Sequence, residues 1–128
     1  QEEMSAIAFT PLAQGLLTGK YLGDGRGHRS QTRSSLPDKP LSHATIAALR
    51  GLNVVAKERG QTLAQMAIQW VLREPTVASA LIGASSVEQI DENLAALAGP
   101  AFDTEELERI DALAEGIDVD LWAVSSKL

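Results

Sequence analysis

The sequence contains no cysteine, so disulfide bridges, thiolate metal ligands and thiol nucleophiles are excluded. Its only histidines, His28 and His43, leave no His-rich metal site, and we expect no bound metal. No apolar run reaches the roughly 18 residues that a membrane span requires. No secretory signal or lipid anchor is recognisable, so we expect a cytoplasmic protein with no membrane partner.

Positive charge is scarce overall and unevenly distributed. The formal net charge of −6 argues against nucleic acid as the main partner. Residues 1–61 carry a net charge of +3 and residues 62–128 a net charge of −9. The positive excess lies in one stretch, at Lys20, Arg26, Arg29 and Arg33. The long basic loop at 23–40 is either an anion contact or a solvated loop, and charge alone favours the solvated loop.

With 128 residues, 45% of them apolar and 22% charged, the chain has the composition of one globular domain or of part of one. Short apolar runs predict strands, and apolar residues at spacings of three and four predict helices. The expected elements are a strand at 5–9, a structured loop at 10–21, the basic loop at 23–40, helices at 42–59 and 62–73, a strand at 77–82, a helix at 85–98 and a last helix from 103. Gly60 should stop the first helix, and capping boxes are expected at 62–65, 85–88 and 103–106.

Two strands joined by a helical crossover form a βαβ unit, so the strands should be parallel. The apolar run at 77–82 suits a strand buried on both faces. Two strands alone cannot bury such faces, nor the helical apolar stripes that include Met66, Trp70, Ile90 and Leu94. The sequence therefore predicts the end of a larger α/β sheet or barrel, and self-association or pairing with a missing N-terminal part.

The junction between the second strand and the next helix predicts an anion site. Residues 82–86 lead from the strand into a helix N-terminus, whose unpaired N–H groups and dipole attract phosphate. Gly83 permits close approach of a ligand, and Ser85 or Ser86 can add a hydroxyl. The polar residues that follow at spacings of three and four are Gln89, Glu92 and Asn93. The alternative is a capped helix with a solvated polar face, which these residues by themselves favour.

Residues 10–21 follow the first strand, at the end where α/β sheets and barrels place ligand sites. The apolar side chains of Leu12, Leu16 and Leu17 suggest that this loop packs over something. The alternative is a structural loop whose glycines serve turns. The sequence shows no acid–base or nucleophile constellation.

Two segments together resemble the C-terminal part of the aldo-keto reductase superfamily. Residues 9–21 (FTPLAQGLLTGKY) resemble its seventh barrel strand and the following loop, and residues 81–93 (LIGASSVEQIDEN) resemble its eighth strand and the following helix. The most similar branch holds the potassium-channel β-subunits and bacterial glyceraldehyde-3-phosphate reductases, and the Leu121-Trp122 tail fits the bacterial side. The resemblance implies an α/β chain that forms the C-terminal part of a (β/α)8 TIM barrel, from an oxidoreductase that reduces carbonyls with NADPH.

The resemblance also implies where NADP would bind. The nicotinamide and pyrophosphate would lie along Thr10, Pro11, Leu12, Gln14 and Gly15. Lys20 and one basic-loop arginine, for which we select Arg29 over Arg26 and Arg33, would face the phosphates. The adenosine end with its 2′-phosphate would be held by Gly83, Ser85, Gln89, Glu92 and Asn93.

The chain departs from the family in length. A (β/α)8 barrel needs about 250 residues, roughly twice this chain. The family's catalytic Asp, Tyr, Lys and His lie on earlier strands, and Tyr21, His28 and His43 do not match them, so no catalytic residue is expected here. The expected function is cofactor binding within a reductase of small carbonyl substrates. The alternative is a non-enzymatic nucleotide-binding or regulatory module from a truncated reductase.

Overall fold

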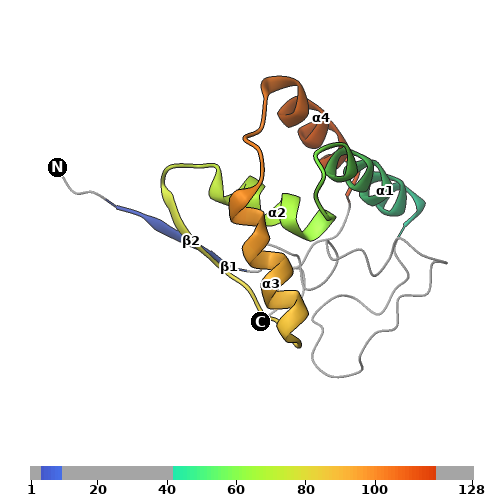
Figure 1. Cartoon of the computed structure of the whole chain (residues 1–128). Coiled ribbons are helices and arrows are strands. Elements are labelled where there is room, and N and C mark those ends of the chain that lie inside the picture. Colours follow the sequence, from blue (N-terminus) through green and yellow to red (C-terminus); the bar gives the residue numbers. More distant parts are fainter. Residues whose placement is uncertain (1–3, 10–41, 118–128) are drawn as a thin grey trace, which may run out of the picture.

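The computed structural model describes residues 4–9 and 42–117, which form an α/β unit (Figure 1). Its elements are β1 (Ala6–Phe9), α1 (His43–Glu58), α2 (Leu63–Leu72), β2 (Val77–Leu81), α3 (Val87–Ala95), the 3-10 helix η2 (Ala96–Ala98) and α4 (Thr104–Ala114). In the view of Figure 1 the strands lie at the left of the body and α1 and α4 at the right. The expected order of strands and helices is confirmed for these residues, and the loops expected at 10–21 and 23–40 lie outside them.

The two strands pair in parallel, as the βαβ pattern predicts. Ile7 lies beside Ser79 and Phe9 beside Leu81, with an irregularity in the register after Ala6. The carboxyl ends of both strands therefore lie at the same edge of the sheet. Among the described residues the sheet has two strands, so each strand has one edge without a partner there.

Helix α1 begins and ends where its sequence signals predict. Ser42 is the N-cap, and its Oγ accepts a hydrogen bond from the backbone N–H of Thr45 at 3.1 Å. Beyond the C-cap Arg59, Gly60 has a φ of +72°. That left-handed conformation is unstrained for glycine, and it ends the helix.

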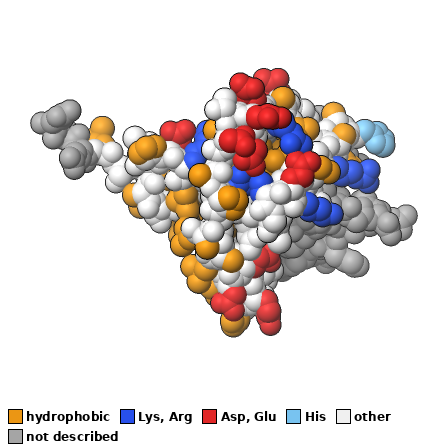
Figure 2. All heavy atoms as spheres, turned by 45° about the horizontal axis from the view of Figure 1, so that its top comes forward, with side chains coloured by type: hydrophobic (Ala, Val, Ile, Leu, Met, Phe, Trp, Pro, Cys, Tyr) orange, Lys and Arg blue, Asp and Glu red, His pale blue; other side chains and the backbone are white. Residues whose placement is uncertain are grey.

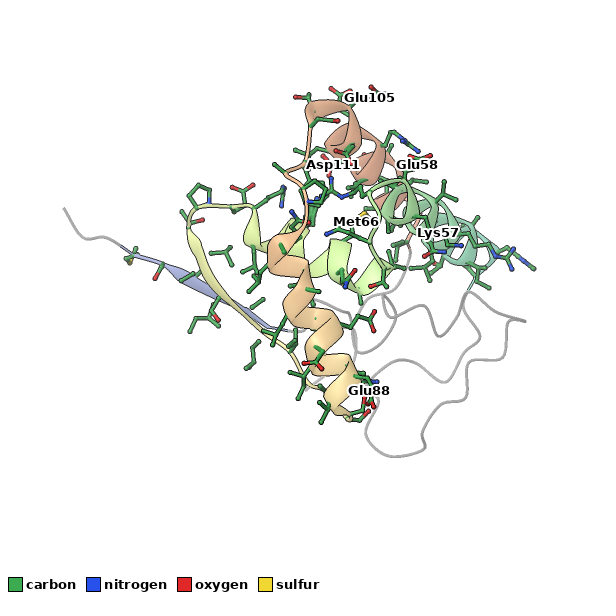
Figure 3. The ribbon with its side chains drawn as sticks, viewed as in Figure 1. Lys57, Glu58, Met66, Glu88, Glu105 and Asp111 are labelled. Carbon is green, nitrogen blue, oxygen red and sulfur yellow. The ribbon has the colours of Figure 1, made fainter. Side chains whose placement is uncertain are left out.

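The hydrophobic core lies between α1, α2 and α4. Its buried cluster consists of Leu52, Val55, Ala56, Leu63, Met66 and Ile110. Figure 3 shows Met66 projecting from α2 toward the space between α1 and α4. The half-buried Trp70 and Leu113 pack against this cluster. The reciprocal capping boxes predicted at Thr62 and Asp103 are confirmed, so α2 and α4 start at fixed positions around the core.

A polar cluster around Arg59 joins these three helices. The side chain is only 3% exposed, and its Nη1 donates to Glu106 Oε2 at 2.7 Å. Its Nε donates to Gln61 Oε1 at 2.9 Å, and Nη2 donates to Gln69 Oε1 at 3.2 Å. The guanidinium also stacks on Phe102, 3.8 Å from the ring centroid. The buried charge is thus held by an ion pair, by amide oxygens and by an aromatic face.

Three expectations are wrong in detail. The strand expected to be buried on both faces is exposed at Ala78, Ser79 and Leu81, because α2 covers one face and no second layer lies over the other among the described residues. The third capping box does not form between Ser85 and Glu88, because the N-cap is Ser86. The expected helix to 98 also changes to the 3-10 helix η2 after Ala95.

Candidate functional site

The predicted anion site is the turn from β2 into α3. β2 ends at Leu81, α3 begins at Val87, and the turn between them follows the carboxyl end of a parallel strand. Because Phe9 pairs with Leu81, the chain after β1 leaves the sheet at the same edge. In Figure 3 the labelled Glu88 marks this end of α3. The fold therefore puts a helix N-terminus at the edge where α/β proteins bind ligands.

The serines of this turn hold it in shape. Ser86 Oγ accepts a hydrogen bond from the backbone N–H of Gln89 at 3.2 Å. The side-chain Oε1 of Gln89 in turn accepts from the backbone N–H of Ser85 at 2.8 Å and from Ser85 Oγ at 3.1 Å. The reciprocal arrangement resembles a capping box displaced by one residue. It fixes the turn and leaves the N–H groups of Val87 and Glu88, which have no partner within the helix, at its open end.

Glycine keeps the approach to this helix end clear. Gly83 is exposed, and a Cβ built there would meet no atom within 4 Å. Ser85 is also exposed, so its backbone and hydroxyl are accessible from solvent. Glu88 occupies the first turn of the helix, where its carboxylate interacts favourably with the positive end of the dipole. An anionic ligand would have to bind beside that carboxylate, and Gly83 and Ser85 offer the uncharged approach.

The polar residues further along α3 lie on its inward side. Gln89 and Glu92 are half-buried and Asn93 is buried, so the three share a face, as their spacing predicts. Helix α2 fixes this face, because Gln65 Nε2 donates to the backbone carbonyl of Glu92 at 2.9 Å. We expected Gln65 only as a member of a capping box, and this second contact had no signal in the local pattern.

The structure brings together five of the predicted cofactor residues, Gly83, Ser85, Gln89, Glu92 and Asn93, on one turn and the helix that follows it. The other predicted residues, Thr10, Pro11, Leu12, Gln14, Gly15, Lys20 and Arg29, lie outside the described residues. Within 4–9 and 42–117 no group of His, Asp and Glu side chains could hold a metal ion. In those same ranges no helix has both the length and the apolar character to cross a membrane.

A hollow of about 620 Å³ lies at the other end of α3, between the end of α2, η2 and the segment before α4. Arg73 and Glu74 form an ion pair there, with nitrogen and oxygen 3.4 Å apart. None of the five predicted residues on the turn and α3 lines this hollow. The candidate site is therefore the turn at Gly83, and the hollow is separate from it.

Comparisons with known proteins identify the family of the chain. The sequence model of the Aldo/keto reductase family matches residues 1–115. The chain is 49% identical over 129 aligned positions to the L-glyceraldehyde 3-phosphate reductase of Escherichia coli (strain K12), a match that covers 96% of the chain and 37% of the relative. It is 35% identical over 118 positions to a probable voltage-gated potassium channel subunit beta of Oryza sativa subsp. japonica, covering 88% of the chain and 36% of that relative.

A putative voltage-gated potassium channel subunit beta of Schizosaccharomyces pombe is 38% identical over 98 positions, covering 72% of the chain and 28% of the relative. The chain thus spans between 28% and 37% of the length of these three relatives. The family model, by contrast, matches most of the chain itself. The chain belongs to the aldo/keto reductase family.

Proposed function

We propose that this chain is the cofactor-binding part of an NADPH-dependent aldo-keto reductase, which in a complete (β/α)8 barrel reduces a small carbonyl compound to an alcohol. The observation that carries the proposal is the turn from β2 into α3, an exposed helix N-terminus approached through a glycine and a serine. The reductase from Escherichia coli, 49% identical, is named for a phosphorylated aldehyde, so a substrate of that class is proposed here too.

In this proposal the start of α3 holds the adenosine end of the cofactor. A helix N-terminus supplies free N–H groups and a positive dipole, the usual setting for a phosphate. Ser85 adds a hydroxyl, and Gln89 already bonds Ser85, so its amide lies beside the same turn. Lys20 and Arg29 would supply positive charge to the phosphates, as charge-assisted hydrogen bonds. Thr10, Pro11, Leu12, Gln14 and Gly15 would follow the nicotinamide and pyrophosphate.

The division of roles within the barrel follows from what this chain contains. The cofactor, when bound, would supply a hydride for the carbonyl carbon, and the resemblance implies that the proton would come from a tyrosine on an earlier strand of the barrel. Gly83, Ser85 and Gln89 bind and orient the cofactor, and they hold no reacting proton. The 128-residue chain alone should therefore bind a nucleotide without reducing a carbonyl compound.

Substitution of Gln89 by glutamate tests the site sharply. A carboxylate at residue 89 can still accept the two hydrogen bonds from Ser85, so the turn keeps its shape. The new negative charge would repel a phosphate and should weaken binding of NADPH and of adenosine 2′,5′-bisphosphate by about tenfold. Ala47→Glu makes the same charge change at an exposed position of α1 and should leave both affinities unchanged. Fluorescence or calorimetric titration measures them.

Three results would contradict parts of the proposal. Equal affinity for NADPH and NADH would show that the 2′-phosphate contributes nothing to binding. Unchanged nucleotide affinity in Gln89→Glu would show that the nucleotide does not bind at the start of α3. Carbonyl reduction by the 128-residue chain alone would show that it holds catalytic groups of its own.

A further inference from the structure

Helix α3 tightens into a 3-10 helix next to two of the residues that we predict to bind the nucleotide. The backbone N–H of its C-cap, Ala96, donates to the carbonyls of Asn93 and Leu94. In a regular α-helix this N–H would donate to the carbonyl of Glu92, four residues back. The Glu92 carbonyl instead accepts a hydrogen bond from Nε2 of Gln65, on helix α2, at 2.9 Å. A side chain of another helix thus binds this carbonyl at the point where α3 leaves the α-helical pattern.

The side chain of Gln65 is held firmly, because both ends of its amide make hydrogen bonds. Its Oε1 accepts from the backbone N–H of Thr62 at 3.0 Å, as part of the capping box that starts α2. Helix α2 is itself anchored in the core by Leu63 and Met66, each 3% exposed. The two bonds fix the orientation of the amide, with its oxygen toward the start of α2 and its donor toward α3.

Little else holds α3 in place among the described residues. Of its nine residues, Asn93 alone is buried there. Val87, Ile90 and Leu94 are 46–70% exposed, and Figure 2 shows hydrophobic side chains gathered along the side of the molecule formed by the strands and α3. In this part of the chain the bond from Gln65 is the hydrogen bond that joins α3 to another helix. Because a segment with few buried apolar contacts opens at a low free-energy cost, this one bond has a large share in the placement of α3.

We infer that Gln65 is a positioning residue of the nucleotide site. It lies on α2 and acts through the backbone carbonyl of Glu92, which fixes the rotation of α3 and with it the face that carries Gln89, Glu92 and Asn93. Side chains that bind a ligand must be held to within about 0.5 Å of their places by supporting hydrogen bonds. This inference rests on the proposed function and adds the residue that keeps the binding face in place.

The role requires a hydrogen-bond donor at the end of the side chain of residue 65. In Gln65→Glu the carboxylate can still accept the bond from the Thr62 N–H, but it has no N–H for the Glu92 carbonyl. In Gln65→Met a side chain of similar length loses both bonds. Thr62→Ala is the complementary control. It removes the Oγ1 that accepts from the Gln65 backbone N–H at 3.2 Å and leaves the bond to Glu92 in place.

Titration of these three variants of the 128-residue chain with adenosine 2′,5′-bisphosphate tests the inference. Gln65→Glu and Gln65→Met should each weaken binding about fivefold, because binding then requires an arrangement of α3 that the lost bond no longer favours. Thr62→Ala should bind as wild type does, although loss of the cap lowers its urea midpoint, as it does in Gln65→Met.

The pattern across the three variants identifies the cause. Weaker binding in the glutamate variant alone would assign the effect to its charge. Weaker binding in Gln65→Met and Thr62→Ala, but not in Gln65→Glu, would assign it to the helix cap. Either pattern would overturn the inference, as would unchanged binding in both Gln65 variants.

Amide hydrogen exchange of α3, measured without nucleotide, separates this inference from the proposed function. Loss of the donor should speed exchange across residues 87–98 in both Gln65 variants and leave it unchanged in Thr62→Ala. A wild-type chain that binds no nucleotide, but whose α3 exchanges faster in both Gln65 variants, would disprove the proposed function and support the placement of α3 by Gln65. Equal exchange in wild type and the Gln65 variants would overturn that placement, whether or not the chain binds a nucleotide.

Discussion

Replacement of Arg59 by alanine should be among the most destabilising single changes in the described structure. The guanidinium donates to Glu106, Gln61 and Gln69 and stacks on Phe102, with a side chain only 3% exposed. Removal of one partner of a buried ion pair costs about 3–5 kcal/mol. Glu106 is 21% exposed, so water can solvate part of the carboxylate that is left behind. We therefore expect a loss of about 2–4 kcal/mol in the free energy of unfolding.

Urea unfolding followed by far-UV circular dichroism measures this loss. With a typical urea dependence, it corresponds to a fall in the midpoint of about 1–2 M. Arg59→Lys keeps the charge but loses the planar fork and the stacking on Phe102, so its midpoint should lie between those of wild type and alanine variant. Arg50→Ala, at an exposed position of α1, is the control and should change stability by less than about 0.5 kcal/mol. An Arg59→Ala variant as stable as the control would refute the view that this cluster holds the three helices together.

Three further changes test single features by the same unfolding assay. A Cβ at Gly99 would collide with the side-chain amides of Gln61 and Gln69. Gly99→Ala should therefore lower the free energy of unfolding by about 1–3 kcal/mol. An unchanged urea midpoint would show that these two side chains move aside freely. Ser86→Ala removes the N-cap of α3 and should lower the free energy of unfolding by about 1 kcal/mol. A loss no larger than that from replacing an exposed serine by alanine would contradict the capping role. The hydrogen bond from Arg59 lowers the pKa of Glu106 below its ordinary 4.5, so this carboxylate stabilises the fold above that pH and loses its contribution as the pH falls through the lowered pKa. As the pH falls from about 6 to about 3, the free energy of unfolding should therefore fall less in Glu106→Gln than in wild type. Parallel falls in the two proteins would contradict the assigned contribution of the Glu106 carboxylate.

The features that the sequence predicted well are those determined within a few residues. Gly60, Thr62 and Asp103 mark helix ends through contacts three or four residues away, and the structure has those ends. The Arg59 cluster could not be predicted in this way, because Arg59 and Glu106 are 47 residues apart in the sequence. Only the packing of α4 against α1 brings them together.

At the candidate site, too, the local sequence pattern predicts the turn but not all of its contacts. A turn from strand to helix with glycine and serine was predicted, and the structure has it between β2 and α3. Two adjacent serines, followed by Glu88 and Gln89, allow two capping registers, and the local pattern does not distinguish them. The structure selects Ser86 as the cap, because the Gln89 side chain then binds both the N–H and the hydroxyl of Ser85.

Burial is the property that periodicity determines least. Leu52 and Val55 lie three residues apart and Ile90 and Leu94 four apart, so each apolar pair lies on one helix face. Leu52 and Val55 are buried in the core, whereas Ile90 and Leu94 are 46% and 58% exposed. Spacing identifies the side of a helix that must pack against something. The packing partner comes from another part of the chain or from another polypeptide. For α1 the packing partners are α2 and α4. For α3 the described residues contain none, so its apolar side is exposed there although its periodicity matches that of the buried side of α1.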